Sequence, residues 1–103
     1  MNLSETDLHE ALIARFDSEL MDALDGRLIN ATWSSSDDVE TMYVGRNYPE
    51  PGRITVKIED ETITVREHDG WAVLSTSTFS GDPVKVARRA AVLVAAVNAE
   101  LGL

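Results

Sequence analysis

The chain has 103 residues, of which 18 are acidic, 9 are basic and none is cysteine, and its formal net charge is −9. This length is close to the common size of one domain, so we expect a single domain over residues 1–103. The negative charge argues against direct binding of a nucleic-acid backbone, which requires the opposite sign. The lack of cysteine excludes disulfides, thiolate metal sites and a cysteine nucleophile.

The sequence predicts no membrane segment and no secretory signal. The longest apolar run, 90–97, is far shorter than the about 20 residues that a bilayer-spanning helix needs. The first residues are acidic and lack a basic region before an apolar core. We therefore expect a cytoplasmic protein. Scarce lysine and abundant acid indicate a GC-rich gene or a salt-rich cytoplasm.

The first 26 residues predict an amphipathic helix. Ser4 is a favourable N-cap and Gly26 a favourable stop. Between them the apolar residues recur every four positions, as on one face of a helix; they are Leu8, Leu12, Phe16, Leu20 and Leu24. The segment holds seven acidic residues and one arginine, so its other face carries most of a charge of −6.

Residues 27–79 change to an alternating pattern, which is typical of strands. The expected strands are 28–33, 39–44, 54–58, 62–66 and 71–79, with a two-residue hairpin turn at Asp69-Gly70. Connections this short exclude parallel crossovers, so the sheet should be an antiparallel meander. One face should turn its side chains toward the helices: Ile54, Val56, Ile58, Ile63, Val65, Trp71 and Val73.

The last helix is marked at both ends, by Asp82 as N-cap, Pro83 as first helical residue and Gly102 as stop. It is apolar nearly all round, and such a helix requires burial on two sides. A domain of this size offers little interior, so we expect a homodimer. The row of small residues that would face the second copy is Ala91, Ala95 and Ala99. Arg88 is a further interface candidate that could pair with the acidic first helix of the same or of another subunit, and we expect the pair within one chain.

The fold class that follows is α+β, with a two-layer architecture and the order α-β-β-β-β-β-α. A five-stranded antiparallel meander would be flanked by an N-terminal and a C-terminal helix that share one of its faces. This outline is similar to that of secretion chaperones that dimerise through a helix, although their elements follow a different order.

No pattern for catalysis, a cofactor or a metal is present. His9-Glu10 resembles the start of a metalloprotease helix, but position 13 is Ile rather than His. We therefore expect His9 to be a packed or edge residue and His68, beside a turn, to be solvated. The acidic clusters at 37–40 and 59–61 lack the ligand spacing of a calcium loop. The chain is thus expected not to be an enzyme.

The loop 45–52 and the strand before it provide three candidate contact residues of the types favoured at interfaces: Tyr43, Arg46 and Tyr48. We expect a non-enzymatic protein-interaction module, a small acidic accessory or adaptor protein whose partner the sequence does not identify. One alternative is an acidic inhibitor that imitates nucleic acid, with carboxylates spaced about 6–7 Å apart. The other is a small-ligand-binding or enzymatic domain, supported only by Trp33, Trp71, Tyr43 and His68.

Overall fold

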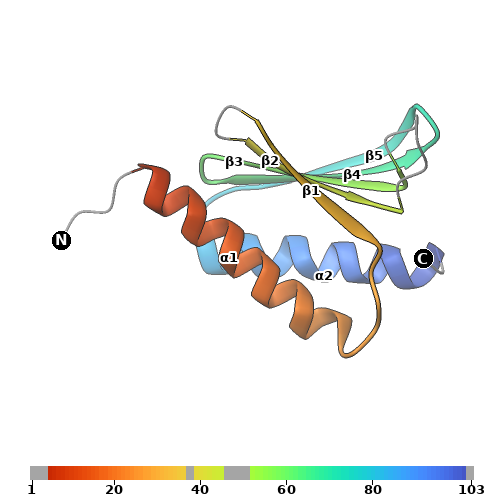
Figure 1. Ribbon diagram of the computed structural model, residues 1–103, viewed down its shortest axis with the longest axis horizontal. Helices are drawn as coiled ribbons and strands as arrows, with labels where there is room; N and C mark the ends of the chain where they lie inside the picture. Colours follow the sequence, from red (N-terminus) through yellow and green to blue (C-terminus); the bar gives the residue numbers. More distant parts are fainter. Residues whose placement is uncertain (1–4, 37–38, 46–51, 102–103) are drawn as a thin grey trace.

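The computed structural model describes residues 5–36, 39–45 and 52–101. It has seven elements, in the order that the sequence predicts (Figure 1). They are α1 (Glu5–Leu24), β1 (Ala31–Ser36), β2 (Val39–Val44), β3 (Ile54–Glu59), β4 (Thr62–Asp69), β5 (Ala72–Phe79) and α2 (Pro83–Leu101). The strands form one antiparallel sheet in the order β1-β2-β3-β4-β5, so the predicted α+β meander is confirmed.

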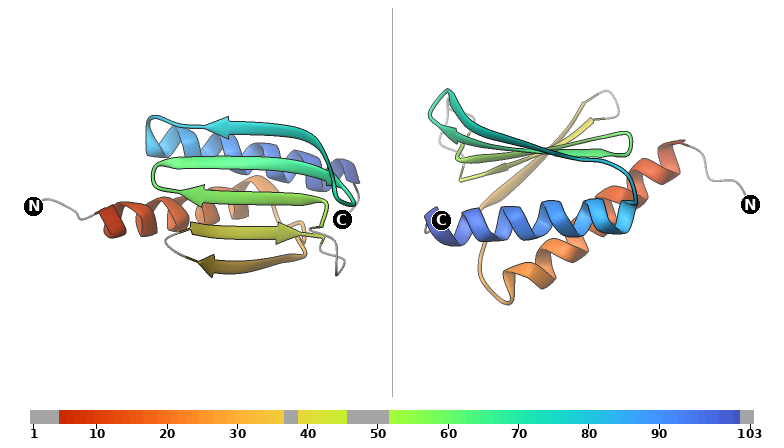
Figure 2. Two further views of the ribbon diagram at one scale, coloured as in Figure 1. Left: turned by 90° about the horizontal axis from the view of Figure 1, so that it is seen from above. Right: turned by 180° about the vertical axis from the view of Figure 1, so that it is seen from behind.

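Both helices lie on the same face of the sheet, but at different angles. Figure 1 shows α2 running along the sheet, whereas α1 crosses obliquely and its C-terminal end lies farthest from the strands. The view from above in Figure 2 places α2 under the β4–β5 side. As a result α1 packs mainly against α2 rather than against the strands. The helical layer is therefore tight on the β4 side and more open on the β1 side.

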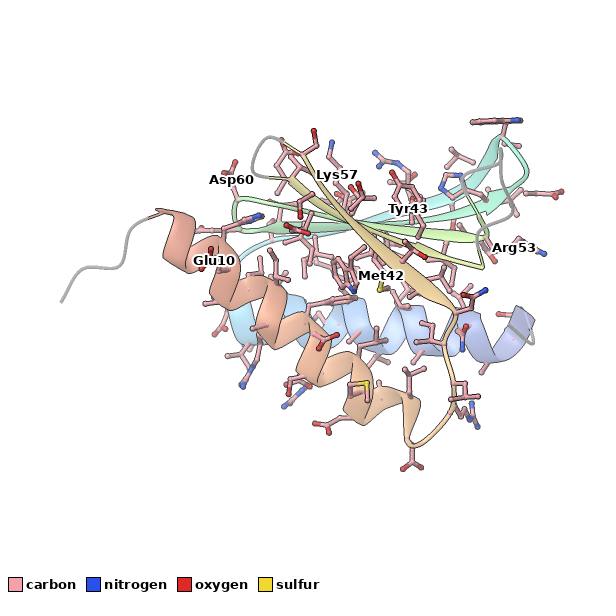
Figure 3. The ribbon with its side chains drawn as sticks, viewed as in Figure 1. Glu10, Met42, Tyr43, Arg53, Lys57 and Asp60 are labelled. Atoms are coloured by element: carbon pink, nitrogen blue, oxygen red, sulfur yellow. The ribbon has the colours of Figure 1, made fainter. Side chains whose placement is uncertain are left out.

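The core forms where the inward face of the sheet meets the two helices. Figure 3 shows Met42 pointing toward the helices, and Tyr43 and Lys57 on the opposite face. The predicted inward residues of the central strands are buried, and so are the residues of the α1 stripe whose side chains the structure describes. These buried residues are Ile54, Val56, Ile58, Ile63, Val65, Leu12, Phe16, Leu20 and Leu24. Burial of this apolar surface is the main term that stabilises the fold.

The helix ends follow the predicted capping chemistry. The Asp82 side chain accepts a hydrogen bond from the backbone N–H of Val84 at 2.9 Å, and α2 begins at the next residue after Asp82. At the end of α1, the left-handed conformation is adopted by Asp25 (φ 50) and Gly26 (φ 82), which reverses the chain. The predicted N-cap Ser4 and the predicted stop Gly102 lie outside the described residues.

The first strand begins three residues later than predicted, at Ala31 instead of Leu28. Because α1 ends far below the sheet, residues 25–30 are used to return to it (Figure 1). The Leu28 carbonyl accepts a hydrogen bond from the Asn98 side-chain amide of α2 at 3.3 Å. Leu28 itself is 89% exposed, so it does not contribute to a buried sheet face. The apolar character of residues 28–29 therefore led to the wrong prediction that the strand begins there.

The prediction that Trp71 and Val73 face the helices is wrong. Asp69 pairs with Ala72, so the two-residue turn is Gly70-Trp71, one position later than expected, and Trp71 is 71% exposed. A register shift in the same hairpin pairs Val73 with His68, and the His68 ring lies on the face away from the helices. The extra residue that a bulge inserts changes which face the following side chains occupy.

The second side of α2 is also covered within the chain. Ala91 is fully buried and Ala95 is only 9% exposed, because α1 packs along α2 while the sheet covers its other side. Both residues are therefore buried without a second copy of the chain. Ala99, at the end of the same row, is exposed.

Candidate interaction surfaces

The residues singled out from the sequence do not converge on one surface. Arg88 Nε lies 3.5 Å from Glu19 Oε2 of α1, so the predicted pairing within the chain is confirmed. Ala99 is exposed on α2, below the sheet, whereas Tyr43 is half-buried on the opposite face of the sheet (Figure 3). Arg46 and Tyr48 lie outside the described residues.

The two histidines are held by packing. His68 is buried, contrary to the expected solvated position, and its Nε2 lies 2.8 Å from the hydroxyl of Thr55. Burial, with a smaller contribution from the positive charge of Arg66, lowers the pKa of His68. The ring nitrogens of His9 are buried and have no hydrogen-bond partner among the described residues. Within that same part of the chain, no group of three or more potential metal ligands is found.

The edge strand β5 is exposed and uncharged. Its eight residues, AVLSTSTF, include no acid or base, although a quarter of the whole chain is charged. Ala72 to Thr76 are all exposed, and the large apolar side chains Val73 and Leu74 are 52% and 59% exposed. Natural sheets protect such edges with lysine, proline, inward charges or a covering segment. The described strand β5 contains no lysine, no proline and no inward-pointing charge.

A groove lies at the other side of the molecule, between α1 and the sheet. We call it the α1–β1 groove; its volume is about 460 Å³, and it is lined by Glu10, Ile13, Ala14 and Asp17 of α1, Trp33 of β1 and Glu40 of β2. It exists because α1 crosses the sheet obliquely and packs on α2, which leaves the inward face of β1 incompletely covered. Trp33 is 36% exposed there.

The groove combines apolar walls with carboxylates. Ile13, Ala14 and Trp33 supply the apolar surface, and Glu10 and Asp17 are exposed at the helix side. Neither of these two acids has a salt bridge with a described residue. Glu40, which pairs across the strands with Ser35, accepts a hydrogen bond from the Ser35 hydroxyl.

Sequence reasoning missed this groove for a physical reason. Glu40 lies on the inward face of β2, in line with the buried Met42 and Val44, where an acidic residue is unexpected. An acidic residue among inward-facing apolar residues could have indicated an opening in the core at this position. Whether a groove forms there depends on the angle of α1, which no residue pattern specifies.

None of the described helices is long and apolar enough to cross a bilayer. Comparisons with protein-family models, curated proteins and solved structures find no match to this chain.

Proposed function

We propose that this protein is a non-enzymatic protein-interaction module that assembles as a homodimer through antiparallel pairing of its β5 edges. The observation that carries the proposal is the exposed, uncharged β5 strand, with Val73 and Leu74 open to solvent. An edge of this kind presents unpaired backbone donors and acceptors to any second strand. Two identical edges related by a two-fold axis satisfy one another.

Charge supports β5 rather than another surface as the contact. Each chain carries −9, so two copies repel one another over most of their surfaces. The opposite edge strand, β1, is also uncharged, but it borders the carboxylates of the α1–β1 groove. The strand next to β5 carries Arg66 beside Glu67 and Asp69, so its net charge is only −1, and β5 itself adds no charge to the repulsion between two copies.

The two α1 acids that line the groove do not fit the alternative of an acidic inhibitor that imitates nucleic acid. Glu10 and Asp17, the two α1 acids that line the groove, are seven residues apart, which corresponds to about 10 Å along a helix. Carboxylates that replace successive phosphates are expected to lie about 6–7 Å apart, so this separation is about one and a half times too long. No carboxylate of the described α1 stands between them.

Light scattering of the parent protein and of two edge variants tests the proposal. The parent should give twice the chain mass at micromolar concentration. Thr76→Lys, near the middle of β5, should give the monomer mass, because each new charge meets its own copy across the axis. Thr32→Lys, on the opposite edge strand, makes the same change of charge at an exposed threonine and should remain dimeric. A monomeric parent, or equal effects of the two variants, would contradict β5 pairing.

A further inference from the structure

We infer that the α1–β1 groove binds a basic, partly apolar peptide segment of a partner protein. The inference deepens the proposed function by naming a partner class, but it concerns a different surface. In the strand order β1-β2-β3-β4-β5, the groove and the β5 edge lie at opposite sides of the sheet. A chain that proves monomeric can therefore still bind such a peptide, and the two proposals fail separately.

The shape of the groove suits a few side chains of an extended segment. Its volume of about 460 Å³ is within the range of roughly 300–1,000 Å³ that is usual for ligand sites. Ile13 and Trp33 offer apolar contacts to an aliphatic side chain. Among the described residues strand β1, which contributes Trp33 to the groove, pairs with β2 alone, so its other edge offers backbone groups that an extended peptide can bind.

The charges around the groove select a cationic occupant. Glu10, Asp17 and Glu40 come from two different elements and line the same groove, and none of the described residues in its lining is a lysine or arginine. Figure 3 shows Glu10 on the part of α1 that lies near the sheet. A second copy of this acidic chain is repelled from such a surface, whereas a basic segment is attracted and oriented.

Trp33 adds a second kind of attraction for a cation. Its indole contacts the Phe16 ring edge to face, yet Trp33 remains 36% exposed, so a lysine or arginine head group can approach the ring. Contacts between a cation and an indole are favourable, and tryptophan is the best of the aromatic side chains for them. The long methylene stems of these residues can cover the apolar walls while their charged ends reach the carboxylates.

Fluorescence titration with a defined probe tests the inference. The probe is a short peptide of lysine and leucine with blocked ends, and Trp71→Phe serves as the background, so that Trp33 is the only tryptophan. Adding the probe should change the Trp33 emission saturably. A peptide with glutamate in place of lysine should not bind, and one with serine in place of leucine should bind more weakly. Salt should weaken the binding because the charges are exposed.

Two double variants of equal charge locate the site. Glu10→Gln with Asp17→Asn should weaken binding of the lysine–leucine probe by about three- to tenfold, which corresponds to two exposed ion pairs. Asp22→Asn with Asp25→Asn removes the same charge from exposed positions of the chain that do not line the groove, and should leave the affinity unchanged. Both proteins should retain the parent's circular dichroism spectrum.

Three outcomes would overturn the inference. One is equal weakening by the two double variants, which would mean nonspecific attraction to a negative chain. Another is the absence of binding at millimolar probe. The last is a change in Trp33 emission when the protein concentration is raised without any probe, which would mean that a second copy of the chain occupies the groove.

Discussion

The Trp33 indole of β1 meets the Phe16 ring of α1 edge to face, with ring centroids 6.1 Å apart and an angle of 78° between the planes. This geometry is favoured by the charge distribution of aromatic rings. Phe16 is completely buried, whereas Trp33 is about one-third exposed. The pair therefore joins the core to the α1–β1 groove, and a change in the position of α1 must alter both.

Truncating the α1 stripe should cost much of the stability of the fold. Phe16→Ala or Leu12→Ala removes a large buried side chain and should lower the free energy of unfolding by about 2–5 kcal/mol, measured in a denaturant titration. Asp22→Asn is the control on the same helix, at an exposed position, and should change the free energy by less than about 0.5 kcal/mol. Similar losses for all three variants would contradict the assignment of the buried face.

A charge on the small-residue row of α2 should destabilise the monomer rather than separate a dimer. Ala95→Glu places a carboxylate between α2 and its packing partners, and should lower the free energy of unfolding by about 2–4 kcal/mol. Ala99→Glu, one turn further along at an exposed position, should be nearly neutral. If instead the Ala95→Glu variant has the same free energy of unfolding as the parent but half its mass in light scattering, this side of α2 is an interface between two copies.

The N-cap of α2 should contribute measurably to stability. Asp82→Ala removes the acceptor of the Val84 N–H, and should lower the free energy of unfolding by about 1 kcal/mol. Asp82→Asn retains an acceptor oxygen and should recover most of that loss. A thermal melt followed by circular dichroism distinguishes the variants, and equal melting temperatures for Ala and Asn would show that the cap bond is unimportant.

Lowering the pH should destabilise the protein through His68. Its pKa is lowered in the folded chain, first by burial and then by Arg66, from an ordinary value of about 6.5. Above that value the ring is neutral in both states. As the pH falls below it, the unfolded chain takes up the proton more readily, so the free energy of unfolding decreases until the folded ring is also protonated.

His68→Gln provides the comparison for this pH dependence. Glutamine offers a hydrogen-bonding group to Thr55 but does not titrate in this range. The free energy of unfolding, measured at pH 7.5 and again at pH 5, should therefore fall less in the variant than in the parent. A parallel loss in both proteins would assign the acid sensitivity to other groups.

The sequence predicted the elements that are specified by local chemistry. Asp82-Pro83 fixes the start of α2, and the strict alternation around Val56 and Val65 fixes which face of the central strands is buried. A helix cap depends on residues next to one another in the sequence, and the alternation of a strand depends on one of its faces being buried. Both can therefore be recognised from a short stretch of sequence.

The errors occurred where distant segments decide the outcome. Leu28 is apolar, but the position of α1 and the hydrogen bond from Asn98 place it outside the sheet. Val73 continues the alternation of β5, but the register shift opposite His68 changes its face. The burial of Ala95 depends on the oblique angle of α1, which is set by packing between the two ends of the chain.

The contact between α1 and α2 has a consequence for synthesis of the protein on the ribosome. All four strand pairings join neighbours in the chain, so the hairpins can form in succession as the polypeptide emerges. The helix that covers β4, α2, is synthesised after all the strands, and α1 has no α2 to pack against until then. During translation the apolar face of the sheet therefore remains exposed until α2 has left the ribosome, and a nascent chain needs protection from aggregation during that interval.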